Sequence, residues 1–265
     1  KFWKKWLASL GNYEEYRNDI NRMKPKKQNE SIYAFINRNI TSTGCLPSDF
    51  SLRYFKYSDD ERFYFTDGMI DYLFESEIDK DILEKLQNLI ELLEDNTIVW
   101  ASCIVDEYYT LNKDKYILGT LDIFLEWARD NAQKYNNNLI FQWAIYLVMY
   151  SKKVETVKIG IALLGLFNLE KEFSIIEILE TLALSDEFAS YVDVALSNLE
   201  NINDIRFDLV KRLSGYGKIS LISKLEVTSL KIGKWLFRYG SKNDIDNCYN
   251  ALNIALKLDL PKIIK

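Results

Sequence analysis

A run of short amphipathic segments between residues 154 and 240 constrains most strongly what this chain can fold into. Apolar residues recur in it three and four positions apart, which is the spacing of one face of an α-helix. The segment VKIGIALLGLF, from Val157, is apolar almost all round and predicts a helix covered on several sides. The apolar stripes, including one just beyond the run, consist of Ile175, Ile176, Leu179, Leu182 and Ala183; Phe188, Tyr191, Val192, Ala195, Leu196 and Leu199; Ile205, Leu209, Val210 and Leu213; Ile219, Ile222 and Leu225; Ile232, Trp235, Leu236 and Tyr239; and Ile245, Cys248, Tyr249, Leu252 and Ala255.

The breaks between these segments carry residues that start and stop helices. Asn203, Thr228 and Asn243 are expected to cap helix starts through a side-chain oxygen. Gly215 and Gly240 are expected to end helices with a positive φ. Helix pairs then recur at roughly 30 residues, the period of helical repeat proteins. The sequence therefore predicts an all-α chain, a HEAT- or armadillo-like helical solenoid.

The N-terminal part is less regular. Residues 1–24 predict one or two amphipathic helices, whose Trp residues either pack on the next helix or lie at a membrane interface. Two aromatic runs around the acidic turn SDDE predict either a short β-hairpin near residues 52–66 or a helix–loop–helix. Asp59, Asp60 and Glu61 in that turn either bind a cation or are simply solvated. We expect N-terminal helices, loop and hairpin over residues 1–67 and the repeat array over 68–265, or else one continuous domain.

Composition excludes several kinds of chemistry. The 265 residues contain no His, which removes His-based catalysis and His metal ligands. Three scattered Cys predict free thiols, with Cys103 and Cys248 as small core residues. A net charge of −5 argues against nucleic-acid backbone binding. The longest apolar run, from Leu139, is about 12 residues and too short to span a bilayer, so we expect no transmembrane segment. The expected free thiols suit a reducing compartment, so we expect a cytoplasmic protein.

Catalytic and cofactor motifs are missing from the sequence. It holds no GxGxxG, P-loop, HExxH or GxSxG pattern. The adjacent carboxylates Asp186 and Glu187 would point about 100° apart on a helix, so they would not act as a catalytic pair. We expect Asp186 to cap the following helix and Glu187 to lie in its first turn. The sequence thus predicts no catalytic, cofactor-binding or metal-binding residues and no cofactor.

The stretch from Gly215 to Asp244, with the following helix, resembles a poorly characterised bacterial family of HEAT-like repeat proteins. The matching residues are Gly215, Gly217, Lys218, Ile219, Leu225, Glu226, Thr228, Ile232, Trp235, Leu236, Gly240 and Tyr249, while Tyr216 stands where the family pattern has Trp. The resemblance covers about the C-terminal 40% of the chain and implies the repeat fold. Some members are labelled limonene hydroxylases, but the sequence has no haem-thiolate, flavin or nicotinamide motif to support that activity.

Two classes of function fit these observations. The first is a non-catalytic scaffold that binds a protein or peptide, because helical repeats present long surfaces. The alternative is an enzyme on a HEAT-like fold, such as a nucleic-acid-modifying glycosylase. The stripe of Tyr249 and Leu252 continues apolar to the C-terminus, so we also expect a second subunit or further repeats to cover this end, with a homo-oligomer as one outcome.

Overall fold

The computed structural model describes residues 30–57, 65–74 and 77–259, and across these ranges every regular element is a helix and none is a strand. The prediction of an all-α fold is confirmed. The predicted helices of residues 1–24, the acidic turn at 59–61 and the end of the chain from residue 260 lie outside the described residues. The helices are α3 (Ile32–Asn39), α4 (Arg53–Lys56), α5 (Met69–Leu73), α6 (Lys80–Glu91), α7 (Ile98–Leu111), α8 (Leu118–Asp130), α9 (Asn137–Tyr150), α10 (Val154–Leu164), α11 (Phe173–Leu182), α12 (Ala189–Ala195), α13 (Ile202–Arg212), α14 (Tyr216–Lys224), α15 (Leu230–Trp235), the π-helical turn η1 (Leu236–Gly240) and α16 (Asn247–Lys257).

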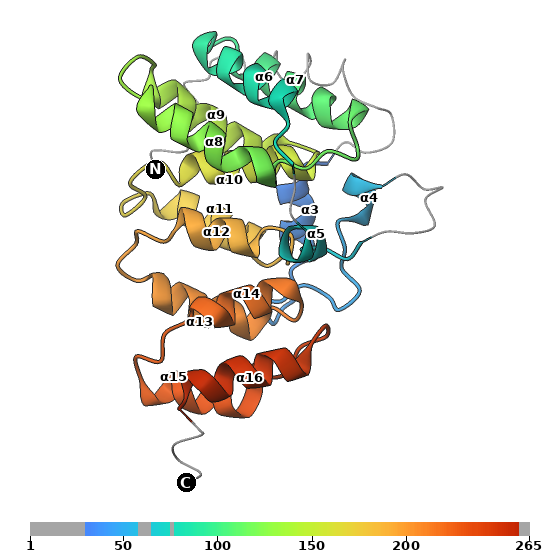
Figure 1. Cartoon of the computed structure of the whole chain (residues 1–265), viewed down its shortest axis with the longest axis vertical. Helices are drawn as coiled ribbons and strands as arrows, with labels where there is room; N and C mark the ends of the chain where they lie inside the picture. The colour runs from blue at the N-terminus through green and yellow to red at the C-terminus, as the bar shows by residue number, and fades with distance from the viewer. Residues whose placement is uncertain (1–29, 58–64, 75–76, 260–265) are drawn as a thin grey trace.

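The helices from α6 to α16 follow one another as layers along the long axis of the molecule (Figure 1). Helix α9 packs on α10, α10 on α12, α12 on α14 and α14 on α16, so each layer contacts the next. One continuous apolar core runs through the layers from Ile32 to Ile254. The short helices α3, α4 and α5 lie beside the middle layers (Figure 1).

Helix α10 is the most enclosed element, as its apolar sequence predicts. Every residue from Val154 to Leu164 except Ala162 is buried. Its contact with α9 is close because Gly160 has no side chain: a Cβ there would lie 2.7 Å from the Cβ of Leu147. Two charged residues, Glu155 and Lys158, are buried with the apolar ones.

Helix α3 joins the N-terminal part to the layers. Ser31 caps it by accepting a hydrogen bond from the Ala34 amide at 3.2 Å. Ile32 and Ile36 are fully buried, and the helix packs against α9 and α11. Segments on both sides of the expected boundary at residue 67 therefore share one core.

The prediction that the first aromatic run forms a strand of a β-hairpin is wrong. Residues Arg53–Lys56 form the single helical turn α4, and residues 58–64 lie outside the described part. Leu52 and Phe55, three positions apart, both face the core, whereas a strand would place them on opposite faces. Phe55 packs edge-to-face on Phe35, with ring centroids 5.2 Å apart.

Gly215 and Gly240 were both expected to end helices with a positive φ; Gly240 does end a helical element, but neither glycine has a positive φ and Gly215 starts a helix instead. Gly215 precedes α14 with a φ of −115°, and Gly240 closes η1 and is buried. Positive-φ glycines in the described residues are Gly44 and Gly68. At Gly240 the reason for glycine is space, since a Cβ would lie 2.6 Å from the Ile254 side chain.

Asn203, Thr228 and Asn243 were expected to cap helices, but their side chains form hydrogen bonds in loops instead. Ser229 caps α15 and Asp246 caps α16. Asn203 holds the loop before α15, accepting a hydrogen bond from the Glu226 amide at 2.8 Å. Asn243 donates to the Gly215 carbonyl at 2.8 Å and so ties the loop before α16 to the start of α14.

Candidate functional site

A cluster of buried charges lies where α4, α5, α10 and α12 meet, with Lys158 of α10 at its centre. The Lys158 ammonium lies 2.6 Å from Asp71, 2.9 Å from Glu155 and 2.8 Å from Glu187. Its side chain is 0% exposed. A lysine this deeply buried is rare unless it is paired. The pairing with these three carboxylates therefore makes the burial of the Lys158 charge possible.

Lys56 of α4 extends the cluster. Its ammonium lies 2.7 Å from Glu187 and 3.8 Å from Asp67. The Gly68 amide donates to Glu187 at 2.8 Å, and the Leu52 amide donates to Asp67 at 2.8 Å. The ionic contacts thereby fasten the segment from residue 52 to 71 onto α10 and the start of α12.

The electrostatics of the cluster follow from burial and from an excess of carboxylates. Burial opposes the charge of both Lys158 and Glu187, but the attraction of opposite charges dominates. Glu155 and then Glu187 hold the pKa of Lys158 well above its ordinary value. Lys158 and then Lys56 lower the pKa of Glu187 to about 2. Burial raises the pKa of Asp67 to about 7, Glu187 raises it further, and Lys56 opposes the shift. Burial likewise raises the pKa of Glu155. Asp67 is therefore a carboxylate that takes up a proton near neutrality.

Glu155 of the cluster is fully engaged by groups of the protein. Glu155 accepts hydrogen bonds from the Ile117 amide at 2.8 Å and from Lys158, so both of its oxygens are engaged within the protein. In the part of the chain that the structure describes, no group of three or more Cys, Asp or Glu residues has a geometry that could hold a metal ion. The ion pairs of the cluster join α4, α5, α10 and the start of α12.

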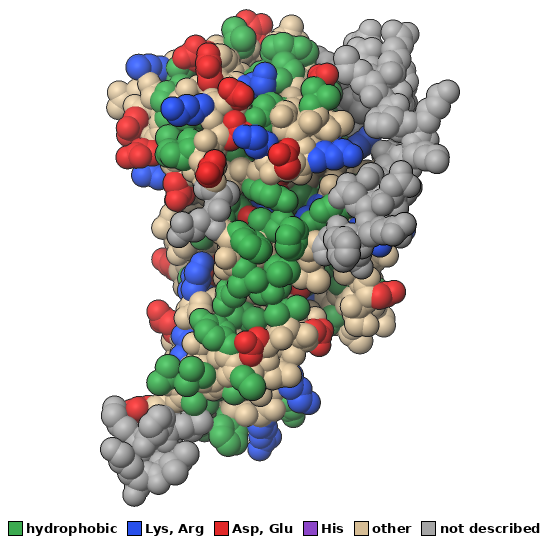
Figure 2. Space-filling view, turned by 45° about the vertical axis from the view of Figure 1, so that its right-hand side comes forward, with side chains coloured by type: hydrophobic (Ala, Val, Ile, Leu, Met, Phe, Trp, Pro, Cys, Tyr) green, Lys and Arg blue, Asp and Glu red, His purple; other side chains and the backbone are tan. Residues whose placement is uncertain are grey.

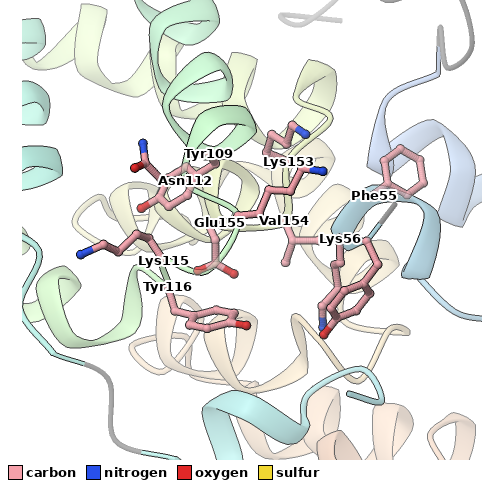
Figure 3. A pocket seen from close by; sticks show the side chains of 11 residues that line it. Phe55, Lys56, Tyr109, Asn112, Lys115, Tyr116, Lys153, Val154 and Glu155 are labelled. Atoms are coloured by element: carbon pink, nitrogen blue, oxygen red, sulfur yellow. The ribbon is translucent and has the colours of Figure 1, made fainter. Parts of the chain in front are cut away.

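A narrow cleft opens beside the cluster, between the C-terminal end of α7 and the N-terminal end of α10 (Figure 3). Its volume is about 40 Å³. Lysines and tyrosines dominate its lining, with Glu155 near the middle (Figure 3). The lining residues are Phe55, Lys56, Tyr57, Tyr109, Asn112, Lys113, Lys115, Tyr116, Lys153, Val154 and Glu155.

The side chains of Asp186 and Glu187 point to different partners, as expected, but Asp186 does not cap the following helix and Glu187 does not lie in its first turn. Helix α12 begins at Ala189, and Asp186 does not cap it. Asp186 instead accepts a hydrogen bond from the Gly217 amide at 2.8 Å, at the start of α14. Burial raises its pKa to about 6, while bonds from the amides of Gly217, Gly215 and Lys218 oppose the shift. Glu187 enters the buried cluster, so these neighbouring carboxylates join different helices.

A third feature is an apolar surface that continues from α5 onto α16, visible as a hydrophobic band in Figure 2. The rings of Phe65 and Phe74 pack edge-to-face at 5.7 Å, and those of Tyr72 and Tyr216 lie 5.2 Å apart. Burial, followed by the neighbouring Tyr249 of α16, raises the pKa of Tyr72 in α5 to about 12. We call this the α5–α16 surface; it comprises Phe65, Tyr72, Leu73, Phe74, Tyr216, Tyr249, Leu252 and Leu256.

The apolar stripe expected on the last helix lies largely on the surface of this chain. Of α16 only Asn250 and Ile254 are buried, while Tyr249 and Leu252 are 45% and 58% exposed. Cys248 is exposed as well, so it is not a core residue. The three cysteines are free.

Trp235 is half-buried and packs edge-to-face on Phe207, with ring centroids 5.6 Å apart.

Sequence reasoning missed the residues of the buried cluster. The signal was present in α10, where Glu155 and Lys158 stand three positions apart within an otherwise apolar helix. Such a pair shares a helix face, but its partners at Asp71 and Glu187 lie 87 and 29 positions away from Lys158 (158 − 71 and 187 − 158). No local pattern connects these positions.

No family model, curated protein or solved structure matches this chain. None of the helices in the described part is long and apolar enough to cross a membrane.

Proposed function

We propose that this chain is a non-catalytic scaffold that binds a protein or peptide through the α5–α16 surface. The layered helix pairs support a HEAT- or armadillo-like array, as does the resemblance of the stretch from Gly215 to Asp244 to HEAT-like proteins. Such arrays use extended faces for binding, with no need for catalytic residues.

The observation that carries the proposal is the exposure of large apolar side chains on one continuous face. Leu73 and Phe74 are each about half exposed, and Leu252 more so. Contiguous apolar surface of this kind is uncommon on monomeric proteins and marks interaction sites. Tyrosine is also enriched in the binding surfaces of proteins, because its ring packs while its hydroxyl stays hydrogen-bonded.

The charges around this surface indicate the kind of partner. Asp244 and Asp246, just before α16, are exposed beside it. The whole chain carries a net charge of −5. Complementary charge steers partners together and excludes wrong ones, so the partner should present basic groups around an apolar centre.

Paired affinity captures test the proposal. The bait chain is immobilised as wild type, as the double variant Leu73→Asp with Leu252→Asp, and as the control variant Phe173→Asp. Phe173 is 71% exposed at the start of α11, away from the α5–α16 surface. A partner retained by wild type and control but lost with the double variant supports the proposal. Equal retention by all three would refute it.

A further inference from the structure

Two tyrosine rings on the α5–α16 surface are held as a pair by different elements. The rings of Tyr72, in α5, and Tyr216, the first residue of α14, lie 5.2 Å apart with their planes at 41°. Tyr216 also lies against Gly68, where an added Cβ would come within 3.3 Å of the Tyr216 Cβ. Tyr72 is 40% exposed and Tyr216 is half-buried. The pair is therefore fixed in place and still reachable from solvent.

The loop before α16 brings two exposed carboxylates, Asp244 and Asp246, to the edge of this pair. The Asp244 amide donates a hydrogen bond to the Ser214 carbonyl at 2.7 Å, two residues before Tyr216. Asp246 uses one carboxylate oxygen to accept a hydrogen bond from the Tyr249 amide at 2.8 Å, and its other oxygen has no hydrogen bond from a described residue. Carboxylate oxygens therefore remain available to a ligand that reaches the rings.

The pKa of Tyr72 agrees with this placement. Burial raises it most, Tyr249 raises it further, and the negative charge of Asp246 adds to the shift. The loop and the ring of Tyr72 are thus near enough for one ligand to meet both.

Among the described residues, no lysine or arginine occupies this position. None has its charged group within 4.0 Å of the carboxylate of Asp244 or Asp246. None lies over the ring of Tyr72 or Tyr216 either. The described part of the chain therefore leaves these rings and carboxylates without a cation of its own.

The lysines of the neighbouring segments have other partners. The Lys218 ammonium donates a hydrogen bond to the Lys242 carbonyl and lies over the Trp235 ring, 5.7 Å from its centroid. Asp244 attracts this ammonium, but from more than 4.0 Å away. The Lys242 ammonium lies over the Tyr239 ring at 5.7 Å. Both cations are engaged on rings outside the Tyr72–Tyr216 pair.

The chemistry of the position favours a guanidinium group over other cations. The face of a tyrosine ring attracts positive charge. The guanidinium group of arginine is flat and weakly hydrated, so it can stack on a ring while its N–H groups bind carboxylates in pairs. The ammonium of lysine is a compact, strongly hydrated charge and does less of both. Arginine and tyrosine are also enriched among the residues that contribute most to protein interfaces.

We propose that the α5–α16 surface recognises an arginine side chain of its partner, which stacks on the Tyr72–Tyr216 pair and binds the carboxylates of Asp244 and Asp246. This inference rests on the proposed scaffold function and names the chemical group that the partner must present. The exposed Leu73 and Leu252 of the same surface are then left for apolar side chains of that partner.

Titration of the full chain with three short peptides tests the proposal without the partner. The probe is acetyl-Leu-Arg-Leu-amide, and its two matched forms carry lysine or citrulline in place of arginine. Citrulline has nearly the shape of arginine but no charge. Binding is followed through the tyrosine ring resonances in NMR at millimolar peptide. The arginine form should bind tightest and shift the signals of Tyr72 and Tyr216. The lysine form should bind severalfold more weakly and the citrulline form at least about tenfold more weakly.

Variants of the chain assign the contact. Tyr216→Leu and Asp246→Asn should each weaken binding of the arginine peptide about threefold or more. Tyr216→Phe should stay within about twofold of wild type, because it keeps the ring. Asparagine also caps helices, so Asp246→Asn stays informative if Tyr216→Leu unfolds the protein. The control Asp122→Asn, which removes an exposed carboxylate of α8, should bind like wild type.

The proposal is overturned if the arginine peptide does not bind, or if the lysine or citrulline form binds as tightly. It is also overturned if Tyr216→Leu and Asp246→Asn both leave the affinity unchanged. The affinity captures distinguish its failure from that of the scaffold function. A partner whose capture depends on Leu73 and Leu252, with no preference among the peptides, leaves the scaffold function standing and removes only the arginine. Equal capture by all three baits refutes the scaffold function and this inference with it.

Discussion

The ammonium of Lys158 lies 2.8 Å from a carboxylate oxygen of Glu187, and the two side chains are 0% and 2% exposed. This contact joins α10 to the start of α12, and Glu187 also receives Lys56 and the Gly68 amide. One glutamate therefore holds three separate segments of the chain together. The layers meet at this point through charge rather than through apolar packing alone.

We predict that Lys158→Met destabilises the fold by on the order of 3–5 kcal/mol, because removing one partner leaves buried charge uncompensated. The free energy of unfolding from urea titration measures this. The control Lys171→Met should change it by less than about 0.5 kcal/mol, as expected of a surface site. A loss below about 1 kcal/mol for Lys158→Met would mean that the cluster is more hydrated than its burial implies.

The stability of the chain should depend on Asp67 between about pH 4 and pH 7. The folded state raises the pKa of Asp67 from 3.8 to about 7, so it binds the proton more tightly than the unfolded chain does. The stabilisation from this group is full below pH 3.8 and is lost as the pH rises through about 7. Asp67→Asn should therefore gain stability relative to wild type, by on the order of a few kcal/mol, between pH 5 and pH 8.

Urea unfolding of both proteins at pH 5 and pH 8 checks this prediction. Glu187, with its pKa lowered to about 2, contributes its stability above pH 4.5 and loses it only at lower pH, so it does not act in this window. Asp106 and Asp186, whose pKa values burial raises to about 6, do titrate here. The difference between wild type and Asp67→Asn removes the effect of Asp106 and most of that of Asp186, whose charge is the smallest of the influences on Asp67. A difference that stays constant with pH would contradict the role given to Asp67.

Gly68→Ala should destabilise the protein by at least about 2 kcal/mol, because left-handed backbone alone costs a Cβ-bearing residue about 1–2 kcal/mol. Gly68 has a φ of 76°, and a Cβ would lie 2.6 Å from the Asp186 carbonyl oxygen. Gly233→Ala is the matched control. Its Cβ would meet nothing closer than 3.4 Å, and within α15 alanine should stabilise by up to about 1 kcal/mol. Similar melting temperatures for the two variants would show that the turn at Gly68 can relax.

Most of the helices could be predicted from the sequence because their apolar residues repeat with the period of a helix. The stripes of α13 and α14 are buried as expected, and so is that of α11 except for the half-buried Ile176. Capping was less predictable because a polar residue in a break has several possible partners. Asn243, for instance, binds the Gly215 carbonyl 28 positions away, while Asp246 caps the helix.

The candidate sites were not predictable, for two physical reasons. The buried cluster depends on pairings such as Lys158 with Asp71, which only the packing of layers brings about. The α5–α16 surface depends on which side of a stripe faces solvent. Periodicity shows that Tyr249 and Leu252 share a helix face, but it cannot show whether another layer covers that face.

The last layer should make the protein associate with itself at high concentration. Leu230 and Phe237 are 73% and 66% exposed around a groove that Val227 and Leu258 also line. We predict a rise in mean mass with concentration in light scattering, as exposed apolar surface becomes buried between copies. Phe237→Asp should abolish this rise. A wild type that stays monomeric at every concentration would contradict the prediction, because the apolar groove around Leu230 and Phe237 would then remain exposed without association.

The central claim is that the α5–α16 surface binds a protein partner, and a titration of the captured partner tests it most directly. Its dissociation constant is measured with wild type, with Leu252→Asp and with the control Phe173→Asp. Truncating or charging a central contact typically costs 2 kcal/mol or more, which is about thirtyfold in affinity. We predict a loss of at least about thirtyfold for Leu252→Asp and wild-type affinity for Phe173→Asp. Unchanged affinity for Leu252→Asp, with the fold intact, would contradict the claim.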